Sequence, residues 1–145
     1  MFGKILQKVY LERFARNFAI LVKGGVPIVT SLRITADAIG NTAYRKVLLT
    51  VADNVENGQA LGAALSDYPS FIPELVSQMV EIGEQTSTID DILMKVAAFY
   101  EREAEQTVGT LTQLLEPVIM LVLGGVVAVI VSGILLPIYN LVAAQ

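Results

Sequence analysis

The stretch that decides the fold is VIMLVLGGVVAVIVSGILL, residues 118–136, in which every side chain is apolar or small and none is charged. As an α-helix it would measure about 28 Å, close to the roughly 30 Å of hydrocarbon in a bilayer. We therefore predict one transmembrane helix over residues 117–140, followed by a short tail at 141–145. The alternative is a buried core helix, but core helices seldom run this long without a charged position.

The charged residues all lie on the amino-terminal side of this stretch. All 10 Lys and Arg and all 14 Asp and Glu are at or before Glu116, a density typical of a soluble domain. Residues 1–116 are numerous enough to enclose a core, so we predict a separate domain there. Lys4 and Lys8 interrupt the first apolar residues, so the sequence shows no signal peptide and we expect this domain in the cytoplasm.

The composition excludes most catalytic and metal-binding chemistry. The chain has no Cys, His or Trp, and therefore no thiolate or imidazole ligand and no histidine proton shuttle. It has no phosphate-binding loop that ends in Gly-Lys, and its net charge of −4 does not suit a nucleic-acid partner. We expect no cofactor and no enzyme activity; a membrane enzyme that uses carboxylates and magnesium ranks last among the functions considered.

Several charged groups have two interpretations. Asp90 and Asp91 with Glu84 could bind a hard cation, although helix capping explains these carboxylates better. The three glutamates at 101, 103 and 105 point to different sides of a helix and are expected on a solvated face. Lys and Arg outnumber Asp and Glu over residues 4–23, and these basic side chains face either solvent or an anionic surface.

Apolar residues recur at helical spacing along the whole domain, with glycine or proline between the segments. The first expected helix ends at Gly24-Gly25, the second runs from Pro27 to Gly40, and the third runs from its N-cap Asn41 to Gly58. The fourth covers residues 60–65, and the fifth runs from Pro73 to near Gly83. The sixth begins after N-cap candidates at residues 86–88. The inward positions expected in the fifth helix are Leu75, Val76, Met79 and Ile82.

The sixth apolar series continues weakly through Leu115, so the membrane helix is expected to continue it directly, with a kink at Pro117. Short connections between amphipathic helices favour antiparallel neighbours. The predicted fold class is all-α, an antiparallel six-helix bundle followed by one carboxy-terminal transmembrane helix.

Two features of the membrane region are candidate contact sites. A carboxylate such as Glu116 at the bilayer boundary either faces water or a partner, or simply marks the interface. Small residues recur every four positions at Gly124, Ala128 and Ser132, which lets another helix approach closely. The alternative for this stripe is ordinary composition that faces lipid.

Four groups of residues together resemble one protein family. The groups are Phe14-Ala15-Arg16 with Leu21, Gly25, Val26 and Pro27; Asn57-Gly58 with Leu61, Leu65, Pro69, Phe71 and Pro73; Gly83-Glu84-x-Thr86 with Ile89, Leu93 and Phe99-Tyr100-Glu101; and Glu116-Pro117 with Leu136-Pro137-Ile138. This combination resembles the F-type platform proteins of type II secretion and type IV pilus assembly over nearly the whole chain. Ser87 departs from the family pattern G-E-x-x-G, whose second glycine permits a left-handed turn; Ser87 is an alternative N-cap.

The resemblance implies a scaffold rather than an enzyme. Such platforms sit in the inner membrane, above a cytosolic assembly ATPase, and act with pilin or pseudopilin subunits, with other inner-membrane assembly proteins and with further copies of themselves. The family generally has two cytoplasmic domains and three membrane helices, and this chain resembles the second domain and the last helix. A tail-anchored adaptor with no role in a filament is the alternative function.

The residues that pattern and resemblance together nominate for partner contact or structure are Arg16, Gly25, Pro27, Gly58, Gly83, Glu84, Thr86, Tyr100, Glu116, Pro117, Gly124, Ala128, Ser132 and Pro137.

Overall fold

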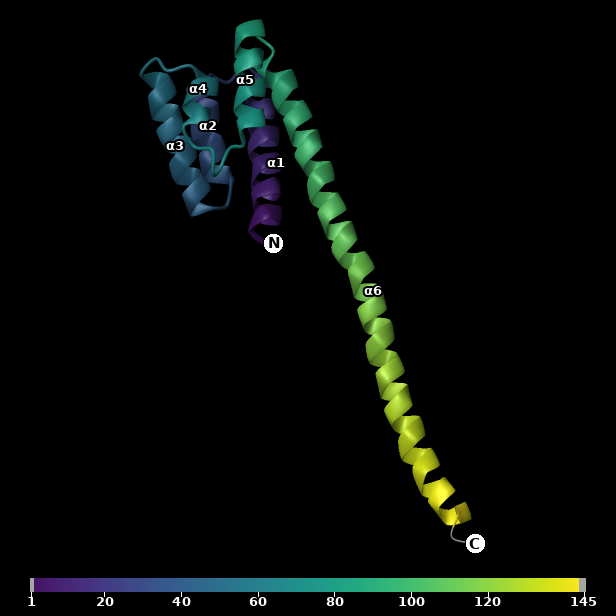
Figure 1. Ribbon diagram of the computed structural model, residues 1–145. Coiled ribbons are helices and arrows are strands. Elements are labelled where there is room, and N and C mark those ends of the chain that lie inside the picture. Colours follow the sequence, from purple (N-terminus) through teal and green to yellow (C-terminus); the bar gives the residue numbers. More distant parts are fainter. Residues whose placement is uncertain (1, 144–145) are drawn as a thin grey trace. The chain divides into compact units, whose positions relative to one another are not determined.

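The computed structural model describes residues 2–143, and these residues form six α-helices and no β-strand. The helices are α1 (Phe2–Lys23), α2 (Ile28–Ala38), α3 (Thr42–Glu56), α4 (Leu61–Ser66), α5 (Glu74–Thr86) and α6 (Ile89–Ala143). Figure 1 shows α1 to α5 gathered into a bundle, in which α1 packs on α2, α2 and α4 pack on α3, and α4 packs on α5. The all-α class is confirmed, whereas the antiparallel order of neighbours stays a prediction.

Local sequence explains where most of these helices begin. The Asn41 side chain accepts hydrogen bonds from the backbone amides of Ala43 at 2.9 Å and Tyr44 at 3.0 Å, so Asn41 is the N-cap of α3 as predicted. Pro27 and Pro73 occupy the N-cap positions of α2 and α5. A proline lacks only an amide that the first turn leaves without a partner.

The bundle encloses one apolar core to which every helix contributes. Its largest fully buried side chains are Leu11, Phe14, Phe18, Leu32, Ile39, Leu48, Val51, Leu61, Leu65, Ile72, Val76 and Leu93. The Phe14 and Phe18 rings, one turn apart on α1, have centroids 5.6 Å apart. Tyr44 contacts the rings of both Tyr10 and Phe71 at 5.1 Å, and its hydroxyl donates a hydrogen bond to the Phe71 carbonyl.

The inward positions predicted for α5 are right at Val76 and Met79 and wrong at Leu75 and Ile82, and its predicted end is wrong. The helix buries Val76, Val80 and Gly83, whereas Leu75 and Ile82 are more than half exposed. It also runs three residues past Gly83, to Thr86. Leu75 and Ile82 share the helical spacing of the buried set, and only the position of α4 and α6 decides which face is covered.

The sixth expected helix and the apolar segment form one helix, α6, with Pro117 and Pro137 inside it. By its contacts the chain divides into residues 1–105 and residues 106–145, so α6 contributes to both units. Within the part that the structure describes, α6 is the one helix long and apolar enough to cross a membrane. The limits at 116 and 140 stay predictions.

Candidate functional site

The Glu84 carboxylate joins α5 to the start of α4. Its Oε1 accepts a hydrogen bond from the Leu61 amide at 3.0 Å, and its Oε2 accepts one from the Gly62 amide at 3.3 Å. Ala60, the N-cap residue of α4, has no side chain that could make such a bond. A negative charge at a helix N-terminus is favourable because the free amides there carry partial positive charge. Glu84 therefore caps a helix other than its own.

The same junction depends on a very close approach of α4 to α5. A methyl group added at Gly62 would lie 2.7 Å from the Glu81 Cβ, 2.8 Å from its Cα and 2.9 Å from its backbone nitrogen. Two of these three neighbours are backbone atoms, which cannot rotate away. Gly62 was not among the residues nominated from sequence, and only the spacing Gly58-x-x-x-Gly62 hints at it.

Gly83 has a packing role rather than the turn role expected from sequence. A Cβ at Gly83 would lie 3.1 Å from the Ile89 Cα and 3.1 Å from the Ile92 Cγ1, so the missing side chain lets α6 approach α5. The expectation that Gly83 ends α5 is wrong, because the chain reverses four residues later. The physical reason is that the tight contact with α6 needs a glycine inside the helix.

Ser87 makes the turn that the family pattern assigns to glycine. Its φ of 56° and ψ of 35° are left-handed, and it is the only non-glycine residue with positive φ among residues 2–143. The Ser87 amide donates to the Glu84 carbonyl at 3.4 Å and the Thr88 amide to the Gly83 carbonyl at 2.8 Å, the bond pair of a Schellman motif. Ser87 therefore closes α5 instead of serving as the N-cap of α6.

Thr86 stabilises the same turn through its hydroxyl, which donates to the Ile82 carbonyl at 2.8 Å and lies 2.7 Å from the Thr88 hydroxyl. Gly25 and Gly58 occupy two other turns, at φ +84° and +100°. These values are left-handed, so glycine is required at both positions.

Ion pairs join α1 to the first turns of α6. Arg16 bonds Glu12 on its own helix and Glu101 at 2.9 Å on α6, and Lys8 bonds Glu103 at 2.8 Å. The hydrogen bonds to Glu12 and Glu101 raise the pKa of Arg16. Glu101 stays exposed and Glu103 is partly exposed, as the prediction of a solvated face expects. The sequence did not reveal that each of the two faces a cation on α1.

Tyr100 anchors this contact from inside the core. Its side chain is buried and comes directly before Glu101 in the chain, and its ring meets that of Phe99 edge-on. Burial, and next the charge of Glu103, raise the pKa of Tyr100. The start of α6 is thus held by an apolar anchor with two ion pairs around it.

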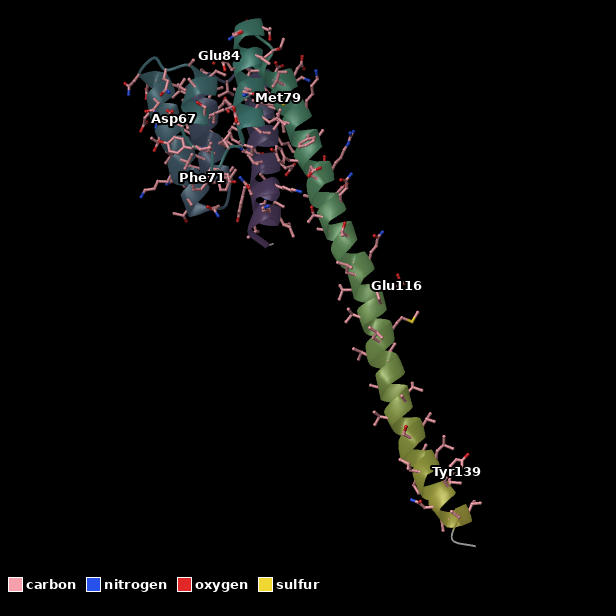
Figure 2. The ribbon with its side chains drawn as sticks, viewed as in Figure 1. Asp67, Phe71, Met79, Glu84, Glu116 and Tyr139 are labelled. Carbon is pink, nitrogen blue, oxygen red and sulfur yellow. The ribbon has the colours of Figure 1, made fainter. Side chains whose placement is uncertain are left out.

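The remaining nominated residues lie in residues 106–143 of α6 and are all exposed. These are Glu116, Pro117, Gly124, Ala128, Ser132 and Pro137. Glu116 projects from the middle of α6 (Figure 2). Nothing lies within 4 Å of a methyl group added at Gly124, so no described residue packs on the small-residue stripe.

The carboxylates considered for a cation do not form a site in the described residues. No group of three or more Asp or Glu there could hold a metal ion. Asp90 and Asp91 lie in the first turn of α6, while both oxygens of Glu84 face the amides of α4. The carboxylates of Asp90 and Asp91 therefore lie at the N-terminus of α6, where the positive end of the helix dipole stabilises negative charge.

An all-α bundle whose last helix continues as a charge-free apolar segment defines a helical protein with one helix that is long and apolar enough to cross a membrane. The family described as type II secretion system (T2SS), protein F, matches residues 14–137, and the chain belongs to this family.

The curated relatives carry the names of two kinds of machinery. The chain is 37% identical over 142 residues to a type IV pilus assembly protein PilC of Thermus thermophilus, a match that covers 98% of this chain and 35% of the relative. It is 41% identical to a type IV pilus assembly protein TapC of Aeromonas hydrophila (96% and 33%) and 34% identical to a type II secretion system protein F of Pseudomonas aeruginosa (96% and 34%). The chain thus spans about a third of the length of the relatives that it matches.

Proposed function

We propose that this chain is part of a non-enzymatic platform of the bacterial inner membrane. The platform couples a cytosolic assembly ATPase to the insertion of pilin or pseudopilin subunits into a filament. Family membership and the names of the relatives support a role in secretion or pilus assembly. The ATPase, the subunits and other inner-membrane assembly proteins as partners, and association with further copies, are part of the proposal.

The observation that carries the mechanism is the continuity of α6. Its amino-terminal part places Leu93, Val96 and Tyr100 in the bundle core, and the same helix runs on to Ala143 with Pro117 and Pro137 inside it. A helix resists bending over many turns because each turn is hydrogen-bonded to the next. A displacement of the bundle by an ATPase would therefore reach the membrane segment along α6.

The proposed topology places residues 1–116 in the cytoplasm, residues 117–140 across the membrane and the tail after Tyr139 on the far side. It rests on the absence of Lys and Arg after Arg102, since basic residues favour the cytoplasmic side. Trypsin added to intact spheroplasts should spare Lys46, which is exposed in the bundle, and cleave there after lysis. Cleavage at Lys46 in intact spheroplasts would reverse the topology.

The coupling is tested by replacing residues 107–110 with four glycines in a cell that assembles the filament, without changing the length of the chain. Four glycines disfavour the helix by about 3–4 kcal/mol relative to four alanines. We expect the glycine variant to reach the membrane in normal amount but to lose filament assembly or secretion, and the matched four-alanine variant to keep them. Equal function of both variants would refute coupling through α6. Unimpaired assembly after deletion of the gene would instead support an adaptor without a filament role.

The small residues Gly124, Ala128 and Ser132 are proposed as the face of α6 that a neighbouring membrane helix contacts. They are supported by their four-residue spacing and by the open space around Gly124. An isoleucine at Ala128 would fill that face, whereas Val129→Ile adds bulk one residue away from it.

A further inference from the structure

The boundary between the polar and apolar parts of α6 carries two hydrogen-bond acceptors, the Glu116 carboxylate and a backbone carbonyl whose usual helical donor is replaced by a proline. Gln113, Glu116 and Pro117 lie on one side of the helix with Met120 and Leu121, and together they line a shallow surface hollow. Glu116 makes no ion pair or hydrogen bond with another described residue. It is the single charge in residues 106–145.

Pro117 adds a second acceptor at the same place. A proline has no amide proton, so in α6 the carbonyl of Gln113, four residues earlier, lacks its helical donor. A carbonyl that has lost its helical donor can accept a hydrogen bond from a neighbouring chain instead. The freed carbonyl lies one turn before the Glu116 carboxylate, so both acceptors can serve the same donor.

The expected depth places Glu116 at the edge of the hydrocarbon, beside the headgroups. If Tyr139 marks the far interface, as aromatic residues commonly do, roughly 30 Å of hydrocarbon reaches back to about residue 119. Glu116 then lies just where headgroup phosphates begin. A short carboxylate side chain cannot extend far toward water as lysine or arginine can, and the anionic leaflet repels it.

A second copy of this helix cannot supply the missing charge. No Lys or Arg follows Arg102, so a parallel copy would bring Glu116 against Glu116. The nearest hydroxyl donors, Thr110 and Thr112, already bond the carbonyls of Gln106 and Val108 on their own helix. Charge complementarity therefore selects a helix of different sequence.

We propose that the hollow formed by Gln113, Glu116, Pro117, Met120 and Leu121 docks a membrane helix of different sequence that carries a lysine or arginine at the depth of Glu116. The cation pairs with the Glu116 carboxylate and donates to the freed Gln113 carbonyl. The apolar side chains of Met120 and Leu121 pack beside it. This inference rests on the membrane placement within the proposed function, but not on the ATPase or the filament.

The test uses photo-crosslinking in the native membrane, with a photoreactive phenylalanine derivative in place of Met120. The matched control carries the same residue in place of Val122, which is also exposed but lies nearly on the opposite side of the helix. We expect a protein adduct from position 120 and little from position 122. The crosslinked peptide, identified by mass spectrometry, should belong to a membrane helix with Lys or Arg within one turn of the crosslink.

Charge variants then test the pairing itself. Glu116→Lys should lower the adduct about tenfold, as expected when one partner of an ion pair at the membrane boundary is replaced by a like charge. Glu116→Gln should lower it less, and changing the identified cation to glutamate should restore it in the Glu116→Lys background. Membrane-fraction amounts are compared first, so that failed insertion is not taken for lost docking.

Four results would overturn the proposal: an adduct made of two copies of this helix, a crosslinked helix without a cation, an adduct that Glu116→Lys leaves unchanged, or reaction with lipid only. A cationic helix from a protein outside secretion and pilus assembly would support the docking site and refute the proposed function. Loss of filament assembly in the four-glycine variant, together with a lipid-only adduct, would support the proposed function and refute the docking site.

Discussion

Glu84 in α5 and Leu61 in α4 are 23 residues apart in the chain, yet the Glu84 carboxylate accepts a hydrogen bond from the Leu61 amide at 3.0 Å. α4 has only six residues, too few to persist as an isolated helix. The carboxylate supplies the acceptor that the alanine N-cap lacks. The position of α4 therefore depends on a side chain from another helix, in addition to the burial of Leu61 and Leu65.

Removing this carboxylate should loosen α4. Glu84→Ala leaves the amides of Leu61 and Gly62 without their acceptors and should lower the free energy of unfolding by about 1–3 kcal/mol. Hydrogen exchange at the Leu61 amide should accelerate, while Glu81→Ala, an exposed carboxylate on the same helix, should change stability by less than about 0.5 kcal/mol. Unchanged exchange at Leu61 would show that Glu84 does not hold α4.

Gly62→Ala tests the close approach of α4 and α5. The added Cβ would meet backbone atoms of Glu81 at 2.8 and 2.9 Å, so the helices must separate. We expect a loss of about 1–3 kcal/mol, the usual cost of overpacking. Gly109→Ala is the control: nothing lies within 4 Å of its added Cβ, so it should instead stabilise α6 by about 0.5–1 kcal/mol. Equal effects in chemical denaturation would contradict the packing argument.

Ser87→Gly should stabilise the protein. Ser87 holds a left-handed conformation that glycine adopts without strain, so the change should raise the free energy of unfolding by about 0.5–1 kcal/mol. The same change one residue earlier, Thr86→Gly, should have the opposite sign, because Thr86 is helical and loses its bond to Ile82. We expect the denaturation midpoint of Ser87→Gly to lie above that of the parent protein and the midpoint of Thr86→Gly to lie below it. A Ser87→Gly variant less stable than the parent would contradict the prediction.

Tyr44 should make stability depend on alkaline pH. Burial, followed by the nearby Tyr100 and Tyr10, raises the pKa of Tyr44 from 10.0 to about 12. The folded state keeps this proton longer than the unfolded state does, so the stabilisation is complete below pH 10 and is lost as the pH rises toward 12. Two pKa units correspond to about 2–3 kcal/mol.

Tyr44→Phe should flatten this decline between pH 10 and 12 without abolishing it, because the pKa of Tyr100 is raised as well. At neutral pH the same variant should lose about 1 kcal/mol with the hydrogen bond to the Phe71 carbonyl. Unfolding measured at pH 8, 10 and 11 separates the two effects. Tyr68→Phe serves as the control. If its stability declined between pH 10 and 12 as little as that of Tyr44→Phe, the pH dependence would not come from Tyr44.

The sequence alone determined the helical class, most helix limits and the apolar segment, because each depends on neighbours along the chain. Asn41 caps α3 through amides two and three residues away, and glycines at 25 and 58 permit turns by their own conformation. The 29 charge-free residues after Glu116 indicate a membrane segment without reference to any partner.

Only the tertiary structure decided what depends on the distance between helices. Gly83 reads as a turn in the sequence, yet it packs against Ile92 because α6 crosses α5 there. The glutamates of α6 read as solvated, yet two of them pair with α1. The partner of Glu84 is a backbone amide on α4, and a backbone amide carries no sequence signal. Helical periodicity fixes where a side chain points on its own helix, but which helix lies opposite is set by how all six pack together.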